Sequence, residues 1–195
     1  TRKIVVIGVF SAIAAILMVL EFPVPFAPSF YGLDFSELPA LIGAFAYGPV
    51  AGVMIEFCKI LIKLVLKPSS TAFVGELANF SISCMLVLPA SVIYLFKKSR
   101  KQAILGTVVG TLIMTAFGSC FNAIYLLPKF SELYGIPLDA IIGMGTAINP
   151  AIHSISGLVL MCVVPLNLLK GGLVSLITIL VYKKLSPILK AAHKQ

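Results

Sequence analysis

Long apolar runs, separated by short polar or proline-rich connections, set the pattern of the chain. Mostly apolar runs extend over residues 4–20, 74–96 and 103–127. Each is close to the roughly 20 residues that a helix needs to cross the hydrocarbon core of a bilayer. Lipid admits only helices and closed barrels, because every backbone polar group must be bonded internally. Runs of this length therefore predict an all-α integral membrane bundle.

The stretch 38–66 is also apolar almost throughout, and it can form one long helix or two shorter ones. The positive-inside rule places the basic clusters Arg2–Lys3, Lys97–Lys101 and Lys183–Lys194 on the cytoplasmic side. An even number of crossings must then separate consecutive clusters. This condition predicts two helices that turn on the cytoplasmic side at Gly48–Pro49.

The same rule applies to the C-terminal half. Residues 103–127 form one crossing that Pro128 is expected to end, and the polar segment 129–139 follows outside. The apolar stretch 140–182 is long enough for two crossings, but two would leave Lys183 and Lys184 outside. One crossing is therefore expected at about 163–184, and residues 140–160 are expected to fold over or between helices. The result is a single domain over residues 1–195, a six-helix bundle with both termini cytoplasmic and approximate helices at 4–20, 37–47, 50–66, 74–96, 103–127 and 163–184.

The composition agrees with a membrane protein and excludes a soluble one. Hydrophobic residues make up 59% of the chain and charged residues 11%, with a mean hydropathy of +1.08. The net charge of +8 does not indicate nucleic acid, because the basic residues gather at the ends of apolar runs. Four isolated cysteines are interpreted as small buried hydrophobic residues that form no metal site: Cys58, Cys84, Cys120 and Cys162.

The first apolar run is interpreted as a retained helix rather than a signal peptide. It passes into Glu21–Pro23 without a small-residue cleavage site. Two pairs of small residues, Gly8 with Ala12 and Ser11 with Ala15, allow another helix to approach closely. The spacing alone leaves open whether that helix belongs to this bundle or to a partner protein.

Residues 22–39 are rich in prolines and aromatic rings and cannot form a continuous helix. Aromatic loops of this kind either anchor a protein at the membrane interface or cover a ligand, and both interpretations stay open. Asp34 and Ser36 are expected to cap a helix that begins near Glu37.

Polar residues of several helices converge on one level beneath this loop in the predicted topology. Asn167 and Lys170 lie in the first turns of the sixth helix, Glu76 and Asn79 at the start of the fourth, and Asn122 near the end of the fifth. They can pair with one another, as Lys170 with Glu76, or form an outward-facing site for a neutral solute with hydroxyl or amide groups. The convergence on one depth favours the binding site.

Two lysines on the third helix, Lys59 and Lys63, are expected to extend their ammonium groups to the interface. No metalloprotease, nucleophile-elbow, Walker or dinucleotide motif is present, so the sequence supports neither an enzyme nor a bound cofactor or metal. The absence of a convincing internal repeat favours a binding subunit over a complete carrier.

Five motifs together resemble the riboflavin-specific substrate-binding (S) components of the energy-coupling-factor (ECF) transporters of bacteria. They are Glu21-Phe-Pro-Val-Pro-Phe, Leu33-Asp-Phe-Ser-Glu-Leu-Pro-Ala-Leu-Ile-Gly, Gly48-Pro-Val-Ala-Gly, Gly75-Glu-Leu-Ala-Asn-Phe and Pro165-Leu-Asn-Leu-Leu-Lys-Gly. The resemblance implies a six-helix, non-catalytic subunit of the bacterial cell membrane that captures riboflavin from outside. It also implies assembly with a transmembrane coupling protein and two cytoplasmic ATPases.

The resemblance also implies roles for particular residues. Asn122, Asn167 and Lys170 match the polar contacts to flavin, and the small-residue pairs of the first helix match a contact with the coupling protein. Pocket-lining roles are implied for Glu76, Asn79, Asp34 and Phe35, and the candidate aromatic walls are Phe26, Phe30, Tyr31, Phe35 and Tyr125. The alternative is a stand-alone carrier for riboflavin or flavin mononucleotide, given the additional positive charges of Lys59 and Lys63.

Overall fold

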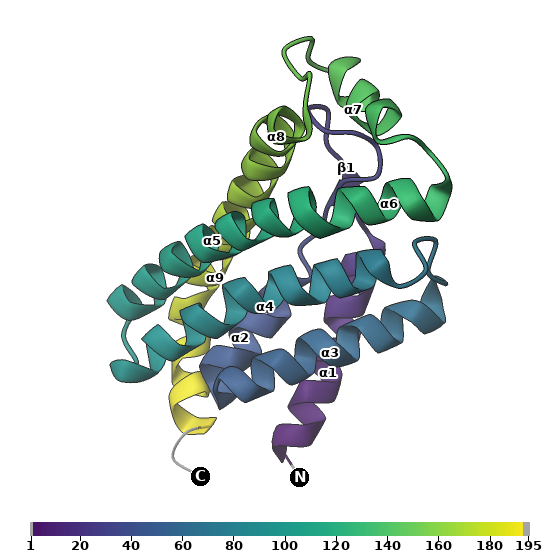
Figure 1. Cartoon of the computed structure of the whole chain (residues 1–195). Helices are drawn as coiled ribbons and strands as arrows, with labels where there is room; N and C mark the ends of the chain where they lie inside the picture. The colour runs from purple at the N-terminus through teal and green to yellow at the C-terminus, as the bar shows by residue number, and fades with distance from the viewer. Residues whose placement is uncertain (1, 193–195) are drawn as a thin grey trace.

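The computed structural model describes the backbone of residues 2–192 and the side chains of residues 3–181, and in this range the protein is almost entirely helical (Figure 1). A two-stranded antiparallel ribbon and two π-helical segments, η1 and η2, complete it. The elements are α1 (Arg2–Val19), β1 (Phe22–Pro23), β2 (Gly32–Leu33), α2 (Glu37–Tyr47), α3 (Pro49–Leu66), α4 (Val74–Phe96), α5 (Arg100–Phe121), η1 (Asn122–Leu126), α6 (Leu127–Tyr134), α7 (Leu138–Thr146), α8 (Ile155–Leu158), η2 (Val159–Val163) and α9 (Val164–Ala192).

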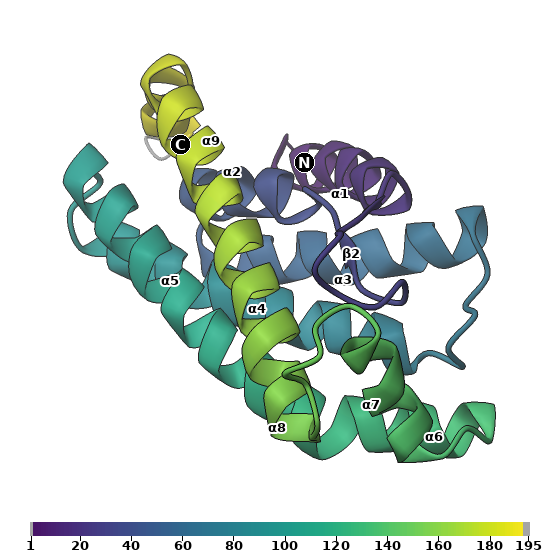
Figure 2. The ribbon, with the colours of Figure 1, turned by 90° about the horizontal axis from the view of Figure 1, so that it is seen from above.

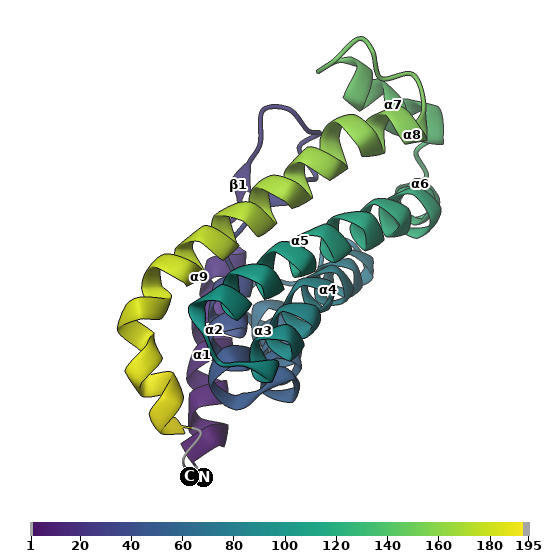
Figure 3. The same ribbon diagram turned by 90° about the vertical axis from the view of Figure 1, so that its left-hand side faces the viewer.

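The short helix α2 lies at the centre of the bundle, in contact with α1, α3, α4 and α9. α5 packs against α4 on one side and α9 on the other. α1 begins and α9 ends at the same end of the molecule, whereas β1, α7 and α8 lie at the opposite end (Figures 1 and 3). Seen from above, α9 crosses the bundle between α1 and α5 (Figure 2). The loop between α1 and α2 therefore covers the end of the bundle that is remote from the termini.

The stretch 38–66 is two helices, α2 and α3, separated at Gly48. Gly48 has φ +92°, a conformation that glycine adopts without steric cost, and Pro49 then opens α3 with its φ already suited to a first helical turn. The same residues therefore end one helix and start the next.

Two prolines, Pro128 and Pro165, lie inside continuous helical segments. The expected end at Pro128 is wrong, because the helix continues through η1 and α6 to Tyr134. Likewise, the last helical segment starts at Ile155 rather than near residue 163 and passes Pro165. Each proline follows a π-helical segment by two residues. We attribute their tolerance to the wider π turn, which leaves room for a ring that would strike the i−4 carbonyl of an α-helix.

Three helical segments of the described chain are long and apolar enough to cross a membrane: Val74–Phe96, Arg100–Tyr134 and Ile155–Val181. Lys3–Val19 and Glu37–Tyr47 are shorter apolar helices. α3 is also 18 residues long, but it is less apolar because it contains Glu56, Lys59 and Lys63. The basic residues Lys183–Lys194 lie outside the residues whose side chains are described.

Two apolar cores occupy the two ends of the bundle. Near the termini, the rings of Phe45 and Tyr94 stack with centroids 4.5 Å apart, and Leu41 and Leu86 pack with them. At the other end, residues from the loop, from α6, from the α7–α8 connection, from α8 and from η2 contribute to the second core, including Tyr31, Leu127, Ile152, Leu158 and Val163. Polar side chains lie between the two cores.

Close contact between α4 and α5 depends on glycine. A Cβ atom placed on Gly106 would lie 2.5 Å from the Ala90 carbonyl oxygen, and one on Gly110 would lie 2.6 Å from the Leu86 carbonyl oxygen. Since backbone atoms cannot yield as a flexible side chain does, the two helices would have to separate.

We therefore expect Gly110→Ala to lower the free energy of unfolding by about 1–3 kcal/mol, the usual cost of overpacking. Gly143→Ala in α7 is the matched control, because nothing lies within 4 Å of its added Cβ. Thermal unfolding of both variants in detergent measures the difference. Equal melting temperatures would contradict the close approach of α4 and α5.

Candidate functional site

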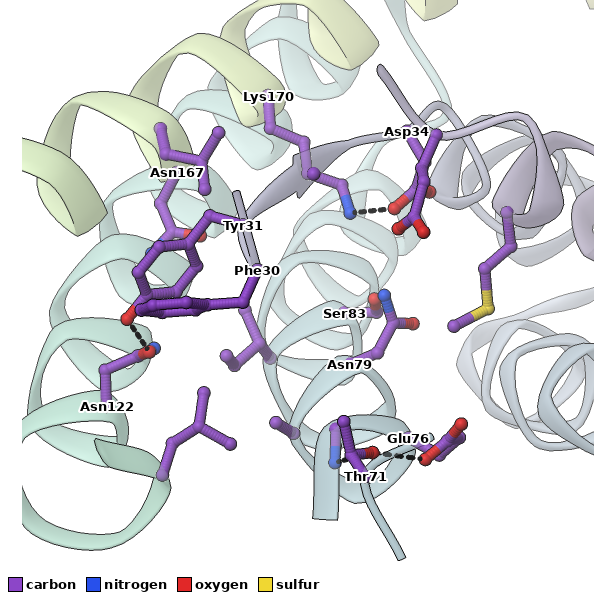
Figure 4. A pocket seen from close by; sticks show the side chains of 18 of the residues that line it. Phe30, Tyr31, Asp34, Thr71, Glu76, Asn79, Ser83, Asn122, Asn167 and Lys170 are labelled. Carbon is purple, nitrogen blue, oxygen red and sulfur yellow. Dashed lines mark hydrogen bonds and ion pairs between the residues drawn. The ribbon is translucent and has the colours of Figure 1, made fainter. Parts of the chain in front are cut away.

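A cavity of about 240 Å³ lies between the two apolar cores, beneath the loop that joins α1 to α2. This is room for a small organic molecule rather than a single water. Side chains from the loop, α2, α3, α4, η1 and α9 point into it (Figure 4). The polar and charged residues that line its interior are Asp34, Glu37, Lys63, Glu76, Asn79, Ser83, Asn122, Asn167 and Lys170.

The structure brings together six of the eight binding residues expected from sequence: Asp34, Glu76, Asn79, Asn122, Asn167 and Lys170. The other two do not line the cavity. Phe35 packs against both apolar cores. Tyr125 is 39% exposed and its ring lies against Phe121. Leu126, its neighbour on η1, faces the cavity instead.

Lys170 is held by two carboxylates, and neither is Glu76. Its ammonium group lies 2.9 Å from Asp34 Oδ2 and 2.7 Å from Glu37 Oε1. Glu76 is bound by Lys63 at 2.5 Å and accepts a hydrogen bond from the Ser69 hydroxyl. The Lys170–Glu76 pair, the alternative that the sequence left open, does not form, because the loop and the start of α2 bring two other carboxylates to Lys170.

The two lysines of α3 also differ from the expectation that their ammonium groups reach the interface. Lys59 is fully buried, forms an ion pair with Glu56 and donates a hydrogen bond to Ser36 Oγ at 3.0 Å. Lys63 is 13% exposed and pairs with Glu76. Extension to the interface relieves a charge that has no partner in the bundle, and here carboxylates lie at the depth of both lysines.

Ser36 does occupy the N-cap position of α2, but its side chain makes no capping hydrogen bond. Its hydroxyl is directed at Lys59 instead.

Asn122 is already engaged by the protein. The Tyr31 hydroxyl donates a hydrogen bond to its Oδ1 at 2.7 Å, and its Nδ2 donates to the Gly118 carbonyl at 2.7 Å. Burial raises the pKa of the Tyr31 phenol, so the hydroxyl keeps the proton that it donates. Asn122 therefore fastens the covering loop to η1 rather than offering a free amide to the cavity.

Three other polar atoms of the lining are free. Asn79 Oδ1, Asn167 Nδ2 and Glu37 Oε2 are buried and have no hydrogen-bond partner among the described residues. Buried polar groups in proteins are rarely left unpaired. One donor and two acceptors are thus available to a bound molecule.

Every charged side chain of the lining lies in an internal ion pair, but the four carboxylates outnumber the three ammonium groups, because Lys170 serves two carboxylates. Lys63 is paired with Glu76, Lys170 with Asp34 and Glu37, and Lys67 with Glu21 at 3.3 Å near the mouth. Burial opposes ionisation of Asp34, but the ammonium groups of Lys170 and Lys59 hold the pKa of this carboxyl below its ordinary value. An uncharged ligand with hydroxyl, amide or carbonyl groups suits such a cavity.

The small residues of α1 divide between two faces. Ser11 and Ala15 are buried within the bundle, whereas Gly8 and Ala12 are exposed. Packing inside the bundle therefore fits the pair Ser11 and Ala15, and contact with a partner protein fits the pair Gly8 and Ala12.

Sequence reasoning missed Glu37, the second partner of Lys170. A glutamate in the first turn of a helix is common, because it complements the helix dipole, and this hides any other role. The path of the proline-rich loop, which decides the contact, leaves no periodic signal.

Comparison with known proteins bears on this geometry. Residues 2–182 match the family model of the ECF transporter, substrate-specific component. "Riboflavin transporter RibU" of Staphylococcus aureus (strain TCH60) is 33% identical over 189 residues, covering 97% of this chain and 93% of that protein. "Riboflavin transporter FmnP" of Bacillus subtilis (strain 168) is 32% identical over 189 residues, covering 95% and 93%.

A similar solved structure is described as "Structure and mechanism of the S component of a bacterial ECF transporter". It superposes with a TM-score of 0.74 at 35% identity, covering 97% of this chain and 98% of the other.

The Tyr31–Asn122 hydrogen bond leads to a prediction about the loop. Tyr31→Phe leaves Asn122 Oδ1 buried without its donor, which costs about 1–3 kcal/mol. We expect faster amide hydrogen exchange in residues 22–33, measured by mass spectrometry. Tyr125→Phe is the control, because this ring is part-exposed and lies outside the cavity. Unchanged exchange in Tyr31→Phe would show that other contacts hold the loop.

Proposed function

The chain belongs to the family of substrate-specific components of ECF transporters, and we propose that it is the riboflavin-binding subunit of such a transporter. It is an integral protein of the bacterial plasma membrane and a transport subunit without catalysis of its own. Riboflavin is the cargo of the cavity rather than a resident cofactor.

The observation that carries this proposal is the group of unpartnered polar atoms in a cavity whose charged side chains all lie in internal ion pairs. Riboflavin is uncharged, and its flat ring and ribityl chain carry many donors and acceptors. Asn167 Nδ2, Asn79 Oδ1 and Glu37 Oε2 supply complementary groups. Because a charged ligand would disturb the internal ion pairs, a neutral one is favoured.

Apolar side chains supply the rest of the surface that a flavin needs. Phe30, Leu126, Val163 and Leu166 line the cavity beside the two asparagines of η1 and α9. These side chains give a flat ring an apolar wall, while the ribityl hydroxyls suit the polar groups of α2 and α4.

We infer six membrane crossings: α1, α2, α3, α4, the continuous segment from α5 to α6, and the continuous segment from α8 to α9. Both ends of the chain are assigned to the cytoplasm, since basic residues gather there. The loop side of the bundle then faces outward, and the cavity receives riboflavin from the extracellular side. Irregular backbone at this depth is tolerated because it lines a cavity.

Transport by a protein of this family needs partners that supply energy. We assign this role to a transmembrane coupling protein and two cytoplasmic ATPases. The exposed face of α1, with Gly8 and Ala12, is the proposed contact with the coupling protein, because small side chains let a partner helix come close.

A stand-alone carrier for riboflavin or flavin mononucleotide is the competing function. Lys63 and Lys67 do line the cavity, as a phosphate site would require. Each is paired with a glutamate, however, so neither offers an uncompensated charge to a phosphate.

Quenching of flavin fluorescence by the purified protein tests the binding proposal. We expect wild-type protein to quench riboflavin, and Asn167→Ala and Asn79→Ala each to weaken binding about 5- to 150-fold, the equivalent of about 1–3 kcal/mol for a lost buried partner. Asn149→Ala, an exposed asparagine outside the cavity, is the control. No quenching by wild-type protein would reject the flavin assignment.

Uptake into liposomes separates the two functions. We expect accumulation of riboflavin only when the coupling protein, both ATPases and ATP are present, because the chain itself supplies no energy source. Accumulation by this chain alone would instead establish the stand-alone carrier.

A further inference from the structure

Lys59 is the most deeply buried ammonium group among the described side chains, and it does not line the cavity. Its Nζ forms an ion pair with Glu56 one turn earlier on α3 and donates a hydrogen bond to Ser36 Oγ at 3.0 Å. The Ser36 contact joins the middle of α3 to the last residue of the covering loop.

A continuous chain of polar contacts leads from Lys59 to the cavity. The backbone N–H of Ser36 donates a hydrogen bond to Asp34 Oδ1 at 2.8 Å. The other oxygen of Asp34 binds Lys170, which does line the cavity. Lys59 therefore fixes one end of the loop turn whose other end holds Lys170.

Glu37 is held in the same cluster. Its Oε1 accepts from Lys170 at 2.7 Å and from the Ser83 hydroxyl at 2.7 Å, which leaves Oε2 free toward the cavity. Because Glu37 directly follows Ser36, a shift of Ser36 also moves this acceptor.

The stability of the bundle does not account for the Glu56–Lys59 pair. Buried ion pairs are often replaced by apolar residues of similar volume without loss of stability, because their desolvation offsets their attraction. Their best attested value is to fix one arrangement among several. In this protein, the arrangement that Lys59 contacts is the loop turn at residues 34–36.

We propose that Lys59 is a positioning residue of the ligand site. Without touching the ligand, it holds Ser36 and thereby sets Asp34, Lys170 and Glu37 in the geometry that receives it. This inference rests on the proposed riboflavin-binding function.

A competing explanation is that Lys59 only neutralises Glu56. The two roles separate in the double variant Glu56→Gln/Lys59→Met, which removes both charges of this pair together. If neutralisation is the whole role, this variant binds riboflavin as the wild type does. If Lys59 positions Ser36, the double variant binds riboflavin more weakly than the wild type does, and Ser36→Ala shows the same loss of affinity.

The experiment measures riboflavin affinity and release rate by fluorescence for full-length protein in detergent. We expect about a tenfold or greater loss of affinity in the double variant and in Ser36→Ala, the usual effect of removing a hydrogen bond to a charged group. Adding Ser36→Ala to the double variant should lower the riboflavin affinity little further, because both variants remove the same Lys59–Ser36 hydrogen bond. Release should accelerate, and amide exchange at residues 33–37 should increase.

Lys129→Met/Glu132→Gln is the matched control, since it removes an exposed lysine–glutamate pair at the same i,i+3 spacing. Wild-type affinity in both the double variant and Ser36→Ala would overturn the proposal. If the double variant does not fold, judged by its melting temperature, Ser36→Ala decides the matter, because it removes only one hydroxyl. Absence of riboflavin binding by wild-type protein would instead count against the proposed function.

Discussion

The whole structure depends on one electrostatic constraint: an ionised side chain inside an apolar bundle must lie against an opposite charge. Lys170 meets it with Asp34 and Glu37, Lys59 with Glu56, and Lys63 with Glu76. These pairs join α9 to the covering loop and α2, and α3 to α4. The loop has no regular secondary structure to hold it beyond a two-stranded ribbon, so its path depends on its contacts with the helices, among them the Asp34–Lys170 ion pair and the Tyr31–Asn122 hydrogen bond.

Internal ion pairing also explains how a strongly polar site can serve a neutral molecule. The charged side chains pair with one another. The lining atoms that remain without a hydrogen-bond partner among the described residues are one atom each of Asn79 and Asn167 and one carboxylate oxygen of Glu37. They discriminate by hydrogen bonding, which is sensitive to the pattern of donors and acceptors on the ligand. The charged residues thus act mainly by holding the polar atoms that face the ligand.

The sequence predicted correctly those features that depend on the pattern of neighbouring residues, such as the limits of helices. The limits of α2 and α4 follow from apolar runs bounded by Gly48–Pro49 and Lys97. Asn79 and Asn167 were expected at the site because amides at one depth of an apolar bundle need partners. The continuation past Pro128, the Lys170 partners and the outward direction of Tyr125 were not predictable, since they depend on π-helical turns and on the path of the loop.

The sequence separation of the central ion pair bears on how the protein is made. Asp34 and Lys170 are 136 positions apart, and Lys170 belongs to α9, which leaves the ribosome after the other described helices. Until then, Asp34 and Glu37 lack Lys170 as their countercharge, whereas the Glu56–Lys59 pair within α3 and the Lys63–Glu76 pair between α3 and α4 need no residue of α9. The site is therefore complete only once α9 has been synthesised and has packed against α2 and the covering loop.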